Sequence, residues 1–282
     1  FLSGQVLGKL KTAIDRRMMS DVPFGVFLSG GIDSTANVAM MSEISNQPVK
    51  TFTIGFSDHT HLNELDYADK VAKHFQTDHH EIRVNGSDMR GYLDDLIVSQ
   101  DEPISDWVCV PLYFVSKLAR DNGVTVVQVG EGSDEQFAGY DSYMKYLKLS
   151  DRMGNGALKS MVGMMSPVLG AMARAMPGRR SKFEQAYEIS RRINLGHELF
   201  YGGSNAFWAI HVEKYMNDAG IAPDPADIDT GVEGLELDGA GSSDSGDIID
   251  SFANAILKAD GSADQLAKMV HAEMRLRLPE LL

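Results

Sequence analysis

The sequence predicts an α/β protein with a doubly wound parallel sheet and a mainly helical C-terminal extension. In the first half of the chain, β-rich segments alternate with helical ones, and such crossovers give a parallel sheet with helices on both faces. Glycine-rich turns follow two of the strands, at the strand ends where these sheets bind their ligands. From about residue 143 to 216 we find helical periodicity only.

Four segments are predicted as strands because they are short, rich in apolar or β-branched residues, and bounded by turn-forming residues. They are residues 24–28, 51–56, 80–84 and 124–129. Apolar residues at helical spacing predict the helices between them. These helices span about 34–44 and 62–75, and a third opens at Pro111 and ends at Asn122-Gly123.

Four parts are expected along the chain. They are an α/β core over 1–150, a helical extension over 151–216, an acidic flexible linker or loop over 217–250, and a helical segment over 251–282 that packs back on the core and is truncated at its end. The third part contains ten acidic residues and no basic one, a composition typical of mobile segments. The methionines of the extension are expected to pack in a core or between helices.

The composition indicates a globular protein of a reducing compartment. A formal net charge of −14 argues against nucleic acid and anionic membranes as partners, but it permits a small anion held by backbone N–H groups and a metal. The one cysteine, Cys109, allows no intramolecular disulfide, and neither a signal peptide nor a convincing membrane span is found. We therefore expect a cytoplasmic protein, and the start at Phe1 indicates a piece of a longer chain.

The first motif, Ser-Gly-Gly-Ile-Asp-Ser at Ser29–Ser34, predicts a phosphate-binding loop. Its two glycines let the backbone turn tightly and approach a phosphate closely, and the helix that follows directs free N–H groups at the anion. Asp33 beside a phosphate implies an intervening Mg²⁺. An ordinary strand-to-helix turn with a capping Ser or Asp is the alternative, but the full hexapeptide after a buried strand favours phosphate binding.

The second motif is Gly-Glu-Gly-Ser-Asp-Glu at Gly130–Glu135, closed by Phe-Ala-Gly-Tyr at Phe137–Tyr140. Three carboxylates crowd this turn at a strand end and would repel a phosphate unless one or two Mg²⁺ compensate. A solvated turn with Asp134 capping a helix is the alternative, and pairing with the first motif favours function.

Four histidines raise the question of a zinc site. They are His59, His61, His79 and His80. The pattern has no sulfur ligand and no clear third ligand, so surface positions and packing at a strand edge are expected instead.

These motifs resemble the pyrophosphate loop of the N-type ATP pyrophosphatases and, more narrowly, the synthetase domain of glutamine-dependent asparagine synthetases. The resemblance is dense from about residue 20 to 146 and implies an adenine nucleotide alpha hydrolase-like fold. The segments that carry it are Val26–Ser34, Thr51–Phe56, Asp101–Asp106 and Gly130–Tyr140, and Arg275–Leu282 is also similar.

The resemblance implies that ATP and Mg²⁺ bind, that a carboxylate such as aspartate attacks the α-phosphorus, and that ammonia from glutamine then displaces AMP to give an amide. Glu131 would form or orient the acyl-adenylate, and Asp33 and Asp134 would share the metal. The implied ATP contacts are Leu28, Ser29, Gly30, Gly31, Asp33, Ser34, Ile54, Val129 and Gly130. The substrates are small molecules, and a homodimer is compatible with the family.

Several departures modify this expectation. Val129 stands where relatives usually have a small hydroxyl residue, so only a backbone contact to adenine is expected there, and Gln136 replaces an apolar residue. The glutaminase half is missing, and the chain stops at Leu282, before a segment whose lysine aids the second half-reaction in relatives. We therefore expect ATP binding at best and little or no amide synthesis from this chain alone.

Three alternatives stay open. A related amidotransferase or cyclase would keep the adenylation and act on a different carboxylate. A tRNA-modifying ATP pyrophosphatase would share the loop, but the acidic charge and the single cysteine count against it. A non-catalytic nucleotide-binding module would bind ATP without releasing pyrophosphate.

Overall fold

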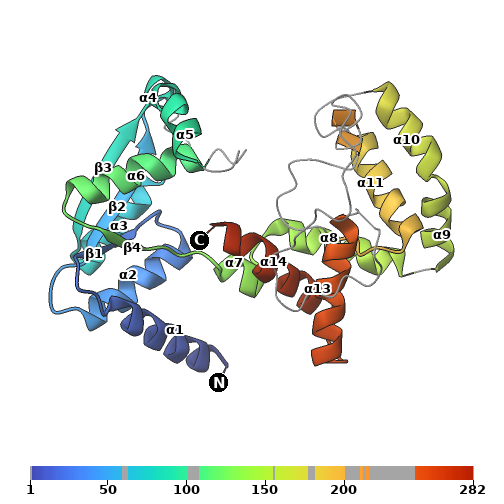
Figure 1. Ribbon diagram of the computed structural model, residues 1–282. Helices are drawn as coiled ribbons and strands as arrows, with labels where there is room; N and C mark the ends of the chain where they lie inside the picture. Colours follow the sequence, from blue (N-terminus) through green and yellow to red (C-terminus); the bar gives the residue numbers. More distant parts are fainter. Residues whose placement is uncertain are drawn as a thin grey trace. The chain divides into compact units, whose positions relative to one another are not determined.

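A computed structural model of the chain describes residues 2–58, 63–100, 108–154, 156–176, 182–200, 210–211, 214–215 and 245–281, without the side chains of 245–248 and 277–281. The chain divides into two compact units, Phe1–Glu131 and Gly132–Leu282 (Figure 1). The predicted four-part division stays a prediction. Predicted features that fall outside the described residues are His59, His61, Asp101–Asp106 and most of the acidic segment 217–250.

The first unit alternates strands and helices as predicted. Its elements are α1 (Leu2–Met18), β1 (Phe24–Phe27), α2 (Ile32–Ile44), β2 (Lys50–Phe56), α3 (Leu65–Phe75), β3 (Asp78–Val84), α4 (Gly86–Gly91), α5 (Leu93–Ser99), α6 (Cys109–Asp121) and β4 (Val126–Gln128). The strands form one sheet in the order β3-β2-β1-β4, and every neighbouring pair is parallel. The α/β fold class is therefore confirmed.

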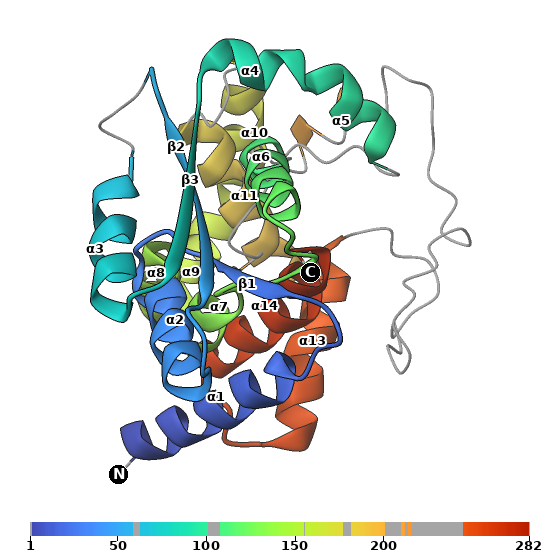
Figure 2. The ribbon, with the colours of Figure 1, turned by 90° about the vertical axis from the view of Figure 1, so that its left-hand side faces the viewer.

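Helices cover both faces of this sheet, which makes it doubly wound. On one face, Val26 and Leu28 pack with buried residues of α1, α2 and α3. On the other face, Phe52 packs against Val115 and Ala119 of α6. Figure 2 shows α3 and α6 on opposite sides of β2 and β3. Because the crossovers change face between β1 and β4, the switch point of the sheet lies between the carboxyl ends of these two strands.

The element limits differ from the predicted ones by a few residues, and the differences have local causes. Helix α2 begins at Ile32 rather than Ser34, because Gly31 is already the N-cap. Helix α6 begins at Cys109, so that Pro111 is its third residue, where the missing N–H has no intrahelical partner to lose. Strand β3 begins at Asp78 because it pairs with β2 along its whole length.

The second unit consists of helices. They are α7 (Ser133–Phe137), α8 (Asp141–Met153), α9 (Gly156–Met164), α10 (Ser166–Ala175), α11 (Lys182–Leu195), α13 (Ser245–Ala259) and α14 (Gln265–Leu281). Tyr143, Phe200 and Met269 form one buried cluster, and Ala173 and Tyr187 belong to another. The helical character expected for the C-terminal half is confirmed for the described residues.

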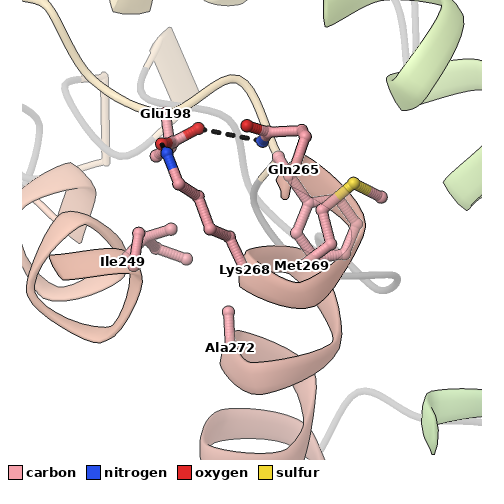
Figure 3. A pocket seen from close by; sticks show the side chains of 8 residues that line it. Glu198, Ile249, Gln265, Lys268, Met269 and Ala272 are labelled. Atoms are coloured by element: carbon pink, nitrogen blue, oxygen red, sulfur yellow. Dashed lines mark hydrogen bonds and ion pairs between the residues drawn. The ribbon is translucent and has the colours of Figure 1, made fainter. Parts of the chain in front are cut away.

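A small pocket in the second unit has room for about one water molecule. Figure 3 shows the Glu198 carboxylate at this pocket, where it accepts hydrogen bonds from Lys268 Nζ and Gln265 Nε2, each at 3.0 Å. The polar groups of the pocket thus pair with one another, and the pocket is a packing feature rather than a substrate site.

Two further expectations bear on the surface. Among the described residues, no helix combines the length and apolar character that crossing a bilayer requires. The expected burial of the methionine-rich stretch is wrong for much of it. Met161, Met164, Met165, Met172 and Met176 of α9, α10 and their flanks have exposed side chains, because the apolar stripe of these helices that faces α11 is formed by other residues, including Gly163 and Gly170.

Candidate functional site

The predicted phosphate loop leaves the sheet at a fixed point, the end of β1. The backbone N–H of Leu28 donates to the Phe52 carbonyl at 2.9 Å, and the Leu28 carbonyl accepts a hydrogen bond from Thr53 Oγ1. Leu28 itself is buried. Both bonds anchor the chain to β2 immediately before the loop, so the loop starts from a rigid element.

Gly30 turns the loop back towards α2 in a conformation that favours glycine. Its φ is +82°, and a Cβ there would lie 2.5 Å from the Cβ of Tyr67 and 2.9 Å from the backbone nitrogen of Ala68. Both the left-handed backbone and the contact with α3 exclude a side chain. The first glycine of the motif is therefore required by the fold, whatever ligand the loop holds.

The two serines of the motif hold the loop closed from within. Ser34 Oγ accepts from the Ser29 backbone N–H at 3.3 Å and donates to the Gly31 carbonyl at 3.3 Å. Ser29 Oγ lies 3.0 Å from Ser34 Oγ and accepts from the Gly31 N–H at 3.2 Å. Ser34 is buried and Ser29 exposed. Ser34 thus shapes the loop, whereas Ser29 is the serine exposed to solvent.

The amino end of α2 completes the loop. Gly31 is the N-cap and has no side chain that could cap the helix, so the first-turn N–H groups are left for another acceptor, in the manner of anion-binding helix ends. Ile32 is 88% exposed and Asp33 lies half-buried in this first turn. A carboxylate beside free N–H groups suits a bound cation and phosphate together better than either alone.

The turn after β4 lies directly against this helix end. A Cβ on Gly130 would lie 3.1 Å from both the Asp33 Cβ and the Ser34 backbone nitrogen. The Asn37 side chain donates from Nδ2 to the Val129 carbonyl at 3.1 Å. The fold thus brings together residues of the two motifs that stand about a hundred positions apart in sequence, at the switch point of the sheet.

The remaining predicted ATP contact, Ile54, lies on β2 beside this edge. It is half-buried and packs with Phe52 and Val115 on the α6 face of the sheet. The first unit therefore contains every predicted ATP contact: Leu28, Ser29, Gly30, Gly31, Asp33, Ser34, Ile54, Val129 and Gly130. The assignment of these residues to ATP stays a prediction.

The acidic motif is divided between the two units. Glu131 is exposed at the end of the first unit, and Asp134 and Glu135 belong to α7 of the second. The Asp134 carboxylate packs on Gly139, where no Cβ would fit. The predicted sharing of a metal between Asp33 and Asp134 stays a prediction, as does the role of Glu131. No group of three metal-ligating side chains is found among the described residues, and Mg²⁺ ordinarily takes only one or two carboxylates beside phosphates and water.

Glu135 differs from its two acidic neighbours, because it points into the protein. Its side chain is 1% exposed, and its Oε1 accepts a hydrogen bond from Tyr140 Oη at 2.8 Å. Burial, together with the carboxylates of Glu273 and Glu135, raises the pKa of Tyr143 far above its usual range. Of the three carboxylates, Glu135 is thus the one that is buried, and its hydrogen bond to Tyr140 gives it a structural role.

His79 and His80 are not a metal pair. Neighbouring residues of a strand point to opposite faces, and His79 Nδ1 lies 2.9 Å from Thr51 Oγ1 whereas His80 stacks on Phe52 at 5.4 Å. Burial lowers the pKa of His79 below its usual value. Both histidines therefore serve packing at the edge strand β3, as expected.

Asn37, which is 8% exposed, was not among the residues predicted from the sequence. A signal was present in the sequence, since Asn37 is a polar residue in an otherwise apolar part of α2 and follows Asp33 by four positions. Residues at this spacing share one face of a helix.

The chain is similar to known proteins over most of its length. The family model described as asparagine synthase matches residues 5–281. A putative asparagine synthetase (glutamine-hydrolyzing) 2 of Methanocaldococcus jannaschii is 40% identical over 136 residues, which are 48% of this chain and 26% of that protein. Asparagine synthetase (glutamine-hydrolyzing) 1 of Bacillus subtilis is 33% identical over 177 residues, 62% of this chain and 27% of that protein.

A putative asparagine synthetase (glutamine-hydrolyzing) of Mycobacterium bovis is 32% identical over 224 residues, which are 78% of this chain and 32% of that protein. The matched regions thus amount to between about a quarter and a third of the length of these relatives.

Proposed function

This chain belongs to the asparagine synthase family, and on that premise we propose that it binds ATP on the Ser29–Ser34 loop and adenylates a carboxylate for conversion into an amide. The observation that supports this most is the packing of Gly130 against Asp33 and Ser34. It joins the loop after β1 to the turn after β4 at the switch point of the sheet. Backbone groups of glycine-rich turns at such a place suit phosphates and nucleotides.

The phosphate half of the site is formed by the loop and the first turn of α2. Backbone N–H groups after Gly31 and the Ser29 hydroxyl would donate to the β- and γ-phosphates, which leave together as pyrophosphate. Their positions are set by the Ser34 hydrogen bonds before any ligand binds. Preorganised donors of this kind stabilise the negative charge that develops on a leaving group without reorganising during the reaction.

The residues present fit a magnesium–ATP complex. The Asp33 carboxylate would hold Mg²⁺ and, in our proposal, Asp134 would share it. When bound, Mg²⁺ supplies positive charge that neutralises the phosphate oxygens. The base and ribose would lie along the backbone of Leu28, Val129 and Gly130, with Ile54 as an apolar neighbour.

Two displacements follow in this proposal. A carboxylate oxygen of the substrate attacks the α-phosphorus. The bond between that phosphorus and the oxygen bridging the α- and β-phosphates breaks, and pyrophosphate departs. Ammonia then attacks the acyl carbon, AMP leaves with the bonding electrons, and a proton is lost from nitrogen to give the amide. We assign Glu131 to orienting the acyl group between these steps.

The wider setting is also a proposal. The substrates would be ATP, aspartate or another carboxylate, and ammonia released from glutamine by a glutaminase domain. We propose the cytoplasm as the location. The function is that of an AMP-forming carbon–nitrogen ligase with glutamine as amide donor.

Exchange of labelled pyrophosphate into ATP tests the proposal. The longest native form of the protein would be assayed with Mg²⁺ and a panel of carboxylates led by aspartate, beside Asp33→Ala and Asp66→Ala. Asp66 is the matched control, because it occupies the first turn of α3 as Asp33 occupies that of α2. Exchange that requires aspartate and is lost only in Asp33→Ala is the expected result.

Other outcomes discriminate the alternatives. If exchange occurs only with a carboxylate other than aspartate, that carboxylate would be assigned as the substrate and the adenylation mechanism would stand. ATP binding without exchange for any carboxylate would favour a non-catalytic nucleotide-binding module. Equal losses in Asp33→Ala and Asp66→Ala would contradict the role given to Asp33.

A further inference from the structure

We infer that Asn37 is a positioning residue that fixes the nucleoside half of the site relative to the phosphate half. The inference rests on the proposed function, since it assumes that the loop after β1 and the turn after β4 hold one nucleotide. It begins from a single contact, the 3.1 Å hydrogen bond from Asn37 Nδ2 to the Val129 carbonyl.

The position of Asn37 on α2 lets it hold the turn after β4 at a fixed place relative to the loop after β1. It follows Asp33 by four residues and Ser34 by three, so the three side chains lie on one face of the helix. The same face meets Gly130 at Asp33 and Ser34. The turn after β4 thus touches α2 at two places, through the Gly130 backbone near the helix start and through the Asn37 amide one turn further on.

The sheet does not fix this turn by itself. Strand β4 is an edge strand of the described sheet, and its pairing with β1 ends at Val26 and Gln128. The next residue of β1, Phe27, pairs with Phe52 of β2, and Leu28 donates to the Phe52 carbonyl. Val129 and Gly130 therefore lie beyond the last paired residue of β4, where the Asn37 amide provides a directional anchor.

The choice of asparagine is itself informative. Asparagine favours the helix interior less than the apolar residues around it do, and this one is buried. A buried amide is stable only when it is hydrogen-bonded. Alanine or leucine at position 37 would favour the helix more, so the amide is explained by the bond it makes to the β4 turn.

Pyrophosphate and ATP report on this coupling differently. Pyrophosphate needs the Ser29–Ser34 loop alone, whereas ATP also needs the Val129–Gly130 backbone at a fixed distance from that loop. Loss of the Asn37 bond should therefore weaken ATP and spare pyrophosphate. A general loss of folded protein would weaken both ligands in proportion.

Isothermal titration of the whole chain with Mg²⁺–ATP and with Mg²⁺–pyrophosphate tests the inference. Asn37→Leu keeps the branched shape and removes the donor, and Asn37→Ala is the second variant in case leucine perturbs packing. We expect the ATP dissociation constant to rise roughly tenfold, which corresponds to one lost buried hydrogen bond, and the pyrophosphate constant to change less than about twofold.

Asn122→Ala is the matched control. Asn122 Nδ2 also donates to a backbone carbonyl, that of Leu118, at 2.8 Å, but it lies at the end of α6 and outside the proposed site. This variant should leave both dissociation constants unchanged. Equal weakening of ATP and pyrophosphate in the Asn37 variants, or unchanged ATP binding, would overturn the inference.

Hydrogen exchange without nucleotide separates this inference from the proposed function. If the unaltered chain binds no ATP, the proposed function fails. Faster amide exchange at Val129 and Gly130 in Asn37→Leu, absent in Asn122→Ala, would still support the positioning role. Unchanged exchange at those two amides would overturn it.

Discussion

Gly30 of the Ser29–Ser34 loop lies directly on Tyr67 of α3. A Cβ at position 30 would stand 2.5 Å from the Tyr67 Cβ, closer than two such carbon atoms can approach, and the residue has a φ of +82°. The loop after β1 is thus supported from behind by the helix that follows β2. This contact explains why position 30 is glycine.

Gly30→Ala should destabilise the protein and abolish nucleotide binding. Gly123→Ala is the control, since Gly123 has a φ of +74° and no atom near its missing side chain. Both variants strain the backbone, by about 1–2 kcal/mol, but only Gly30→Ala adds a collision, for a total of roughly 2–4 kcal/mol. Urea unfolding of both variants measures the difference. Similar free energies of unfolding for the two variants would show that α3 shifts to make room for the added methyl group and that the contact with Tyr67 does not require glycine at position 30.

Tyr140→Phe should destabilise the second unit by leaving a buried carboxylate oxygen without its donor. Tyr140 Oη donates to Glu135 Oε1 at 2.8 Å, and Glu135 is 1% exposed. Losing one partner of a buried hydrogen bond costs about 1–3 kcal/mol. Thermal unfolding beside Tyr67→Phe, whose ring is exposed, provides the measurement. A loss of stability no greater than that of the control would mean that a water molecule replaces the tyrosine hydroxyl as the donor to Glu135.

His79 should make the stability of the protein depend on pH. Burial lowers the pKa of His79, against the opposing carboxylates of Glu81 and Asp69, so the unfolded chain binds a proton more readily than the folded one. The free energy of unfolding should therefore fall as the pH is lowered through the ordinary histidine value of about 6.5. Below the folded-state pKa the loss should grow no further.

Urea titrations between neutral and mildly acidic pH would measure this dependence. His79→Asn should flatten the curve, because asparagine does not titrate, and the exposed His74 changed to Asn should leave it as it is. A curve of the same slope in His79→Asn would assign the pH dependence to other groups, of which His271 is one, since burial lowers its pKa too.

Arg192→Met should be severely destabilising. Arg192 Nε donates to Glu188 Oε1 at 2.7 Å, and both side chains are 3% exposed. Removing one member of a buried ion pair takes that partner from the remaining buried charge, at a cost of about 3–5 kcal/mol. Lys73→Met breaks a pair of the same spacing with Asp69 on the surface and should cost less than about 1 kcal/mol. Comparable losses of stability in both variants would contradict the larger contribution assigned to the buried ion pair.

Much of the first unit was predictable because its signals are local. The order of strands and helices followed from the spacing of apolar residues, and parallel pairing followed from the helical crossovers between the strands. The loop after β1 was predictable for the same reason, since Ser29–Ser34 is one contiguous hexapeptide whose glycines and serines interact with one another.

In the acidic motif, the local sequence does not predict which carboxylate is buried. Glu131, Asp134 and Glu135 are equivalent in sequence as carboxylates of one turn, yet Glu135 is buried and bonded to Tyr140 while Glu131 is exposed. Glu135 turns inward to Tyr140 of the same motif, on a helix that packs against α14, and that packing involves residues beyond the motif. The same limit applies to the methionines of α9 and α10. Helical spacing predicts that apolar side chains share one face of a helix, but it does not show whether another helix packs on that face.

By itself, then, the sequence determined the parallel α/β architecture, the glycine-rich loop after β1 and the family, because each depends on residues that are neighbours along the chain. The tertiary structure alone decided that Asn37 bonds Val129, that Gly130 packs on Asp33, and that Tyr67 supports Gly30. These contacts join residues from separate elements. Their existence depends on how α2, α3 and β4 are packed against one sheet, which no local pattern specifies.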